Sequence, residues 1–318
     1  MRVGVIFPGQ GSQVVGMGAE IAAWAPAAAE LFERAAPIVG YDLLALCREG
    51  PEERLRDTKY SQPAIFVTNC ALAAAVTENE GRFVPVVSAG HSFGEYCSLV
   101  LAASLDFDAA LALVNARGTA MQHAAELVAG GMAAVLGLDA DEIEAAVEQV
   151  RSDGGRVQLA NFNAPSQIVI SGELEAVRRA GDLCLEAGAK RVVPLNVAGA
   201  WHSELMDPAV PVFAPYVERA RVALPKFDVI SNVDAEPYRD VAHIKENLVR
   251  SVTAEVLWHA TSLRLLESEL DLVVEFGASP VLGPMLRRLA GAPEIVSVSD
   301  RAGIEKLHAK LGAPAPAH

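Results

Sequence analysis

A short glycine-rich turn at residues 90–94 constrains the fold of this chain more than any other segment. It reads Gly90-His91-Ser92-Phe93-Gly94 and follows residues 84–89, whose apolar, β-branched character predicts a buried strand. Residues 95–103 predict a buried helix directly after the turn. A strand, Gly-x-Ser-x-Gly and a helix in this order predict a nucleophile elbow, which exposes the serine hydroxyl near the N–H groups of a helix N-terminus. The alternative is an ordinary Gly/Ser loop without a catalytic role.

Composition narrows the class of protein. The chain has 318 residues, 52% of them hydrophobic and 21% charged, which predicts a globular protein with one large domain or two smaller ones. Lys and Arg number 26 against 40 Asp and Glu, giving a net charge of −14. No basic cluster interrupts this balance, so we expect no nucleic-acid partner.

The cysteines and the apolar runs indicate where in the cell the protein is found. The four cysteines are widely spaced, which predicts reduced thiols and neither a disulfide framework nor a metal site. The apolar segment after Met1 is too short for a signal peptide. No run approaches the roughly 18 apolar residues of a membrane helix. We therefore expect a soluble protein with no membrane contact and a cytoplasmic location.

The order of predicted elements indicates an α/β fold with two units. Helical stretches are predicted at residues 17–37, 62–79 and 106–128. Residues 129–198 then alternate as β-α-β-β-α-β, the order of a ferredoxin-like unit. Strands return at residues 228–232, 272–276 and 295–298, which together with residues 3–7 predict a mainly parallel sheet. We therefore predict a large body, residues 1–128 and 199–318, with an inserted subdomain at residues 129–198.

A serine nucleophile needs a base, and the chain has seven histidines. His202 stands apart because it follows the predicted inserted unit, where the chain re-enters the body and a cleft between the two units would lie. Position alone does not separate a general base from a structural histidine.

Two further residues are candidates for substrate contacts. Arg117 lies on a strongly apolar predicted helix, where it would form a buried ion pair, extend its head group to solvent, or bind a substrate carboxylate through its planar guanidinium. Gln10 lies in the turn after the first strand, either as an ordinary turn residue or with its N–H facing the elbow as a second oxyanion donor.

Taken together, short motifs along the chain resemble the malonyl-CoA:acyl-carrier-protein transacylases of bacterial fatty-acid and polyketide synthesis. They span about residues 7 to 283. The motifs are Phe7-Pro8-Gly9-Gln10-Gly11-Ser12-Gln13, Gln62-Pro63-Ala64, Gly90-His91-Ser92-Phe93-Gly94-Glu95-Tyr96, Arg117-Gly118, Met121-Gln122, Asn161-Phe162-Asn163-Ala164-Pro165, Trp201-His202-Ser203 and Ser231-Asn232-Val233-Asp234.

The resemblance implies an α/β-hydrolase-like core with the ferredoxin-like insert, and a role for each matching residue. Ser92 would accept the acyl group and His202 would act as general base and acid, with no cofactor. The main-chain N–H groups of Phe93 and Gln10 would form the oxyanion hole, and Arg117 would hold the malonyl carboxylate. A main-chain carbonyl orients the histidine in this family, and the position that aligns with it is Ser251.

The resemblance also implies the substrates and partners: malonyl-CoA, coenzyme A and an acyl carrier protein, bound by a monomer. Trp201, just before the histidine, would disfavour an α-methyl group, because a bulky aromatic there accompanies malonyl in related polyketide modules. Lys190-Arg191, Arg178-Arg179 and Arg287-Arg288 are candidate docking cations, although solvated surface charge is the simpler interpretation.

The chain departs from the family pattern at several positions. Phe93 replaces the commonest Leu, Trp201 the usual Phe, and Ser251 a frequent Gln; Ala254-Glu255 replaces Asn-Pro, and residues 277–280 replace Gly-Pro-Gly-Lys. The catalytic pair is unchanged, so the departures bear on acyl choice and carrier affinity.

Three alternative functions remain: a hydrolase that edits acyl-carrier thioesters, a trans-acting polyketide acyltransferase with another extender unit, and a non-catalytic docking subunit.

Overall fold

Two β-sheets organise the computed structural model, which describes residues 1–77 and 83–312. The larger sheet has the strand order β7-β2-β1-β8-β9, and every neighbouring pair is parallel. Its strands are β1 (Val3–Phe7), β2 (Pro85–Gly90), β7 (Asp228–Ile230), β8 (Leu272–Phe276) and β9 (Glu294–Val298). All five residues of β1 are buried, as expected for the central strand of a parallel sheet covered on both faces. The predicted parallel sheet is confirmed.

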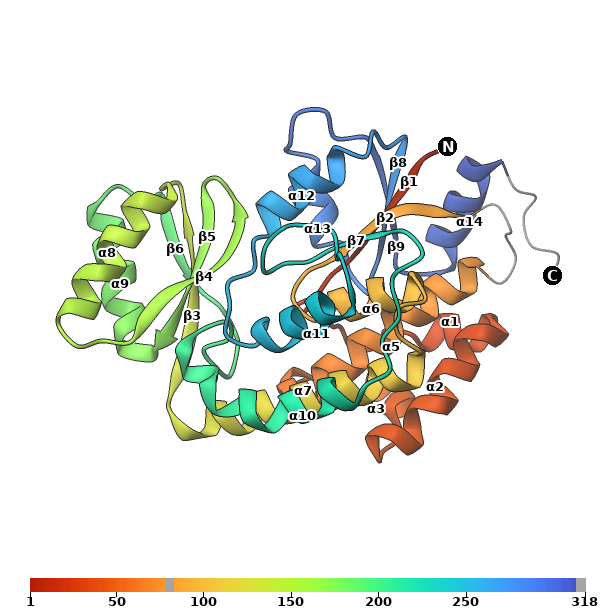
Figure 1. The fold of residues 1–318 in the computed structure, drawn as a ribbon, viewed down its shortest axis with the longest axis horizontal. Coiled ribbons are helices and arrows are strands. Elements are labelled where there is room, and N and C mark those ends of the chain that lie inside the picture. The colour runs from red at the N-terminus through yellow and green to blue at the C-terminus, as the bar shows by residue number, and fades with distance from the viewer. Residues whose placement is uncertain (78–82, 313–318) are drawn as a thin grey trace.

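Helices cover the parallel sheet on both sides (Figure 1). Helix α5 is buried over most of its length and nearly all the way round, and it packs against α2 and α7. The helices of this body are α1 (Ala19–Trp24), α2 (Pro26–Val39), α3 (Leu43–Glu49), α4 (Glu52–Arg56), α5 (Thr58–Thr77), α6 (Gly94–Leu101), α7 (Phe107–Leu127), α10 (Val210–Arg219), α11 (Val241–Arg250), α12 (Trp258–Leu266), α13 (Leu282–Leu286) and α14 (Arg301–Leu311), with a 3₁₀ helix at Glu204–Ala209.

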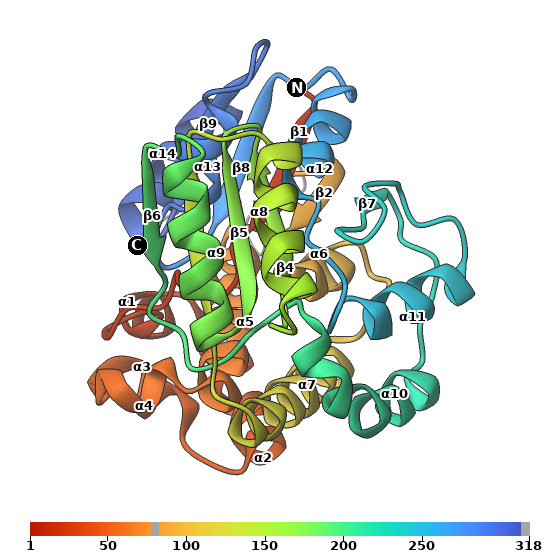
Figure 2. The same ribbon diagram turned by 90° about the vertical axis from the view of Figure 1, so that its left-hand side faces the viewer.

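The smaller sheet is antiparallel, with the order β4-β5-β3-β6. Its elements are β3 (Gly130–Leu136), α8 (Ala140–Ser152), β4 (Val157–Ala164), β5 (Gln167–Glu173), α9 (Leu174–Glu186) and β6 (Arg191–Pro194), all within residues 129–198. The ferredoxin-like arrangement is confirmed. Ile143, Val147 and Val150 of α8 pack against the sheet and form a separate core. Figure 2 shows α8 and α9 on the outer face of this sheet, so its other face is turned toward the body.

Some element boundaries differ from the prediction. The helix predicted at residues 17–37 is two helices, because Ala25 is extended before Pro26, and a residue before proline disfavours the helical conformation. The helix predicted at 62–79 begins at Thr58; residues 78 and 79 lie outside the described residues. The last strand of the inserted unit, β6, ends at Pro194, four residues before the predicted end of that unit.

The two units join through the main chain beside Val256. The Phe162 N–H donates to the Val256 carbonyl at 2.9 Å, and the Val256 N–H donates to the Ala160 carbonyl at 2.8 Å. Strand β4 of the small sheet is thereby tied to the segment that precedes α12. Among the helices of residues 1–77 and 83–312, none has the length and apolar character needed to cross a membrane.

Candidate active site

Ser92 lies in a sharp turn between β2 and α6, as the sequence predicts. Its φ is +52°, a left-handed conformation that side chains other than glycine rarely adopt. The flanking glycines make the turn possible: a Cβ on Gly90 would lie 2.0 Å from the Gly94 main chain, and a Cβ on Gly94 would lie 2.4 Å from the Phe7 carbonyl oxygen. The Ser92 N–H donates to Asn232 Oδ1 at 2.6 Å, which fixes the strained residue.

His202 meets Ser92 from the point where the chain leaves the small subdomain. The distance from Ser92 Oγ to His202 Nε2 is 2.8 Å, and the imidazole is buried. His202 Nδ1 donates to the Ala254 carbonyl at 3.0 Å. Because a carbonyl only accepts, Nδ1 carries the proton and Nε2 is free to accept the serine hydroxyl.

The carbonyl that orients His202 differs from the expected one. Ser251 was predicted for this role, but the hydrogen bond goes to Ala254, three residues later. The reason is the turn after α11, in which the Ala254 N–H donates to the Arg250 carbonyl and the chain doubles back. The Ser251 carbonyl accepts from Arg117 Nη2 at 3.4 Å, and it acts on His202 only as a secondary influence on the imidazole pKa.

The surroundings of His202 keep the imidazole neutral. Burial lowers its pKa from 6.5 to about 3, and the charges of Arg117 and His91 act in the same direction. The carbonyls of Ala254 and Ser251 oppose this shift without reversing it. A neutral imidazole at physiological pH can accept the serine proton, as a general base must.

Arg117 of α7 is fully buried and reaches the serine hydroxyl. Its Nη1 donates to Gln62 Oε1 at 3.0 Å and its Nη2 donates to Ser92 Oγ at 3.3 Å. Its Nε has no hydrogen-bond partner among residues 1–77 and 83–312. Within the described part of the chain, its hydrogen-bond partners are neutral, so Arg117 neither forms a buried ion pair nor extends to solvent. A buried cation of this kind is suited to an incoming anion.

The predicted oxyanion donors lie at the first turn and at the elbow. Phe93 is the N-cap of α6, and Gln10 follows β1, with its side-chain amide donating to Thr58 Oγ1 at 3.2 Å. Among the hydrogen bonds of residues 1–77 and 83–312, none is donated by the main-chain N–H of Gln10 or of Phe93.

A cavity of about 250 Å³ opens beside these residues, between the body and the small sheet. Ser92, His202, Arg117 and Gln10 line this cavity, and Trp201, itself buried, lies next to the histidine. Residues 129–198 contribute apolar side chains to the lining, and also three amides. The apolar ones are Met132, Ala134, Val169, Leu195 and Val197, and the amides are Asn161, Asn163 and Gln167. In the described ranges, no group of three or more His, Cys, Asp or Glu side chains is placed to hold a metal ion.

Comparisons with known proteins identify the family. Residues 5–299 match the acyl transferase domain family. The malonyl CoA-acyl carrier protein transacylase of Haemophilus influenzae is 39% identical, over 94% of this chain and 96% of its own length. The chain belongs to the malonyl-CoA:acyl-carrier-protein transacylase family.

Solved structures lead to the same family. The transacylase of Coxiella burnetii superposes with a TM-score of 0.93 at 35% identity, covering 98% of both chains. A malonyl-transacylase solved with a type II polyketide acyl-carrier protein gives a TM-score of 0.91 at 38% identity, covering 96% of this chain and 98% of that one. The chain is therefore an acyltransferase with the α/β-hydrolase-like core of these transacylases.

Sequence reasoning gave no role to several residues that shape this transacylase site. Gln62 holds Arg117, and His91 Nε2 lies 3.0 Å from Asn163 Oδ1, which links the elbow to β4. Asn232 holds the Ser92 N–H. Gln62, Asn163 and Asn232 all lie in motifs that resemble the family, so the motifs marked them without revealing what they contact.

Proposed function

We propose that this chain transfers a malonyl group from malonyl-CoA to the phosphopantetheine thiol of an acyl carrier protein through an ester on Ser92. One observation carries the proposal. Ser92 Oγ lies 2.8 Å from a neutral imidazole and 3.3 Å from a buried guanidinium that has no counter-ion within the described residues. A nucleophile, a base and an anion-binding group therefore meet at one oxygen atom.

In the first step His202 Nε2 takes the Ser92 proton as Oγ attacks the thioester carbonyl carbon. The negative charge that forms on the carbonyl oxygen is stabilised by the main-chain N–H groups of Phe93 and Gln10, each contributing about 3–4 kcal/mol. The carbon–sulfur bond then breaks, and the proton passes from His202 to the departing coenzyme A thiolate. The malonyl ester remains on Ser92.

The second step reverses the first with a different thiol. Neutral His202 takes the proton of the carrier's phosphopantetheine thiol, and the thiolate attacks the ester carbonyl. The bond to Ser92 Oγ breaks, and His202 returns the proton to that oxygen. Each step exchanges one acyl bond for another, so neither needs an oxidant, a reductant or a metal.

Two side chains account for the choice of malonyl. Arg117 pairs with the free carboxylate, whereas an acetyl group would leave the guanidinium buried and unpaired. Trp201 lines the cavity next to His202, and we expect its bulk to exclude an α-methyl group. A single methyl changes binding by only about 1–3 kcal/mol, so we expect the second preference to be weaker than the first.

The carrier must bring its thiol to the same cavity, and cations near its mouth are suited to an acidic partner. Arg191 of β6 lies opposite Leu136 of β3 in the small sheet, so its side chain is on the same face as the cavity residue Ala134. Arg288 lies two residues beyond the end of α13, and Met285 of that helix lines the cavity. Both are exposed and, within the described residues, form no ion pair.

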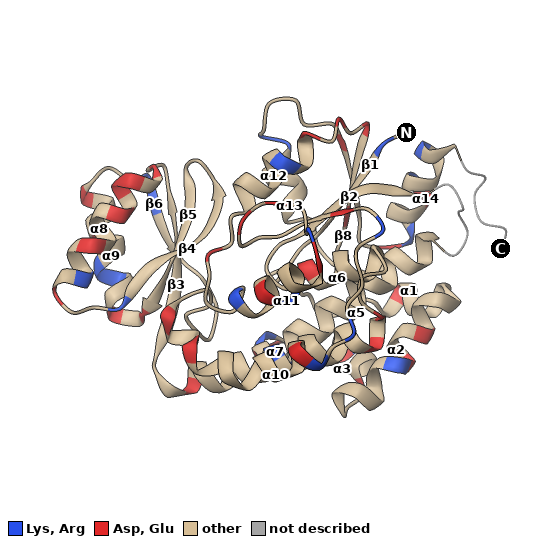
Figure 3. Ribbon diagram, viewed as in Figure 1, with Lys and Arg blue, Asp and Glu red and all other residues tan. Residues whose placement is uncertain are grey.

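The third candidate pair is placed differently. Arg178 pairs with Glu175 and Asp182, and Arg179 pairs with Asp153, on the outer helices of the small subdomain, where both signs of charge are mixed (Figure 3). We therefore include Arg191 and Arg288 in the proposed docking surface and leave Arg178 and Arg179 out.

Mass spectrometry of the protein mixed with malonyl-CoA tests the proposal. We expect a malonyl adduct on the peptide that contains Ser92, and none in Ser92→Ala. An unmodified protein, or an adduct on another residue, would refute the assigned nucleophile.

A further inference from the structure

The conformation of Ser92 depends on a hydrogen bond from a distant loop. The φ of Ser92 is +52°, and its N–H donates to Asn232 Oδ1 at 2.6 Å. A non-glycine residue in this region is strained and persists only where its surroundings hold it. Asn232 is buried and lies just beyond the end of β7. Whatever fixes Asn232 therefore fixes the nucleophile.

Asn232 is itself held at both sides of its main chain. Its carbonyl accepts from the Leu257 N–H at 2.9 Å. Its N–H donates to Glu95 Oε2, also at 2.9 Å. With the main chain anchored at both groups, the side-chain oxygen that faces Ser92 has little freedom to move.

Glu95 is a buried carboxylate that the transfer mechanism does not use. Only 2% of its surface is exposed, and it lies in the first turn of α6, three residues after Ser92. Its second oxygen accepts the hydroxyl of Tyr238, so one carboxylate holds both ends of the loop at residues 232–238. Burial raises the pKa of Glu95 to about 7, although the hydrogen bonds from Tyr238 and Asn232 stabilise the ionised form and oppose that rise.

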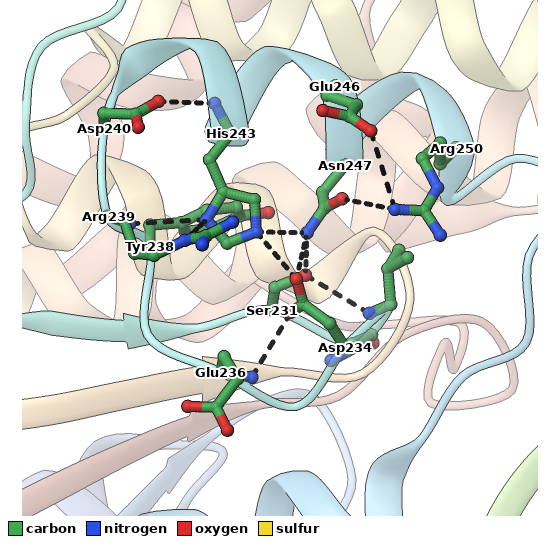
Figure 4. Close-up of polar contacts among 12 residues, drawn as sticks. Ser231, Asp234, Glu236, Tyr238, Arg239, Asp240, His243, Glu246, Asn247 and Arg250 are labelled. Carbon is green, nitrogen blue, oxygen red and sulfur yellow. Dashed lines mark hydrogen bonds and ion pairs between the residues drawn. The ribbon is translucent and has the colours of Figure 1, made fainter.

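The far side of the same loop is clamped to α11 (Figure 4). Asp234 accepts from His243 Nε2 at 2.6 Å and from Asn247 Nδ2 at 3.0 Å. Asn247 Nδ2 also lies 3.1 Å from Ser231 Oγ. The loop is thus held between α11 on one side and Glu95 on the other, and Glu95 is the contact that faces the elbow.

We propose that Glu95 is a positioning residue for the nucleophile: acting through Asn232, its carboxylate sets the orientation of Ser92 and so the approach of Ser92 Oγ to His202 Nε2. The contacts form a closed circuit, from Ser92 along the chain to Glu95, across to Asn232, and back to the Ser92 N–H. The proposal rests on the proposed function only in taking Ser92 as the nucleophile.

A serine-directed fluorophosphonate probe tests this without malonyl-CoA or a carrier. The labelling rate of Ser92 is measured for the full chain, for Glu95→Gln, for Asn232→Ala and for the double variant. In Glu95→Gln an amide replaces one of the two acceptor oxygens, and we expect labelling to slow by about 10- to 100-fold, the range for a misplaced reacting group. With malonyl-CoA, we expect kcat to fall by a similar factor while KM changes less than about twofold.

The double variant tests the path. If Glu95 acts through Asn232, the double variant labels no more slowly than Asn232→Ala alone. Val147→Ala is the control for stability, because Val147 packs in the separate core of the small subdomain; we expect it to lower the melting temperature and leave labelling unchanged.

Three results would overturn the proposal: normal labelling of Glu95→Gln, normal labelling of Asn232→Ala, or single effects that multiply in the double variant. Asn232→Ala is decisive even if Glu95→Gln fails to fold. Failure of the proposed function has a different signature, since the probe would then label Ser92 in the unaltered protein while malonyl-CoA would not.

Discussion

Replacing Arg117 with alanine should change which acyl group the protein accepts. In the structure Nη2 lies 3.3 Å from Ser92 Oγ, and Nε has no hydrogen-bond partner among residues 1–77 and 83–312, so we expect both to donate to the carboxylate of a malonyl group attached to that oxygen. Two hydrogen bonds to a charged group contribute about 1.5–3 kcal/mol each, or about 3–6 kcal/mol together. At 1.36 kcal/mol for each factor of ten, kcat/KM for malonyl-CoA should fall by about 10²- to 10⁴-fold.

The acetyl thioester provides the internal reference. Acetyl-CoA has no carboxylate to lose, and the substitution removes a guanidinium that acetyl leaves unpaired. We therefore expect kcat/KM for acetyl-CoA to fall far less than that for malonyl-CoA, or to rise. The quantity to measure is the ratio of the two kcat/KM values, because Arg117 also contacts Ser92 and Ser251, and loss of those contacts lowers both rates.

Two further variants complete the experiment. Arg117→Lys keeps the charge but loses the planar fork, so its ratio should lie between those of the unaltered protein and Arg117→Ala. Arg34→Ala removes an arginine that pairs with Asp108 on the body, and it should leave the ratio unchanged. A malonyl-to-acetyl ratio that Arg117→Ala leaves within about threefold, well below the change estimated from those hydrogen bonds, would refute the carboxylate assignment.

The remaining predictions concern the acyl pocket, pH and the carrier. Trp201→Ser should raise kcat/KM for methylmalonyl-CoA relative to malonyl-CoA by about 10- to 200-fold, as one methyl group allows, and an unchanged ratio would remove Trp201 from the selectivity argument. Because burial lowers the pKa of His202 to about 3, the acylation rate should show no loss with a midpoint near 6.5 as pH falls from 7 to 5. The unfolded chain binds that proton near pH 6.5 and the folded chain does not, so stability should fall as pH decreases from 6.5 toward 3, and His202→Gln should reduce this slope in denaturant titrations. Arg191→Glu and Arg288→Glu should raise KM for the carrier and leave KM for malonyl-CoA unchanged. Arg178→Glu should leave both KM values unchanged, and equal effects from all three variants would contradict the docking surface.

The sequence predicted those parts of the molecule that local patterns determine. The elbow could be predicted from the sequence because Gly90 and Gly94 have no room for a Cβ, and that requirement appears directly as a motif. The two sheets could also be predicted. The parallel strands are continuous apolar runs, and the α8 and α9 helices of the insert are amphipathic. The split at Ala25 was missed although Pro26 is a local signal, because the apolar periodicity continues through it.

The site itself depends on contacts that no local pattern encodes. His202 is 110 residues from Ser92, and its position alone favoured a structural histidine. Asn232, which accepts from the Ser92 N–H, is 140 residues from Ser92 in the sequence. Glu95 is 137 residues from Asn232, and it accepts from the main-chain N–H of Asn232, a group that almost any residue could supply. The shift from Ser251 to Ala254 has the same origin, since which carbonyl faces the imidazole depends on how the turn after α11 closes.

The most direct test of the account follows a malonyl group after it has left coenzyme A. The protein is acylated with labelled malonyl-CoA, freed of the remaining thioester, and mixed with a carrier that bears its phosphopantetheine arm. We predict that label leaves Ser92 and appears on the carrier thiol faster than it appears as free malonate. Label released only as malonate, at a rate that the carrier does not change, would identify a hydrolase and contradict the transfer.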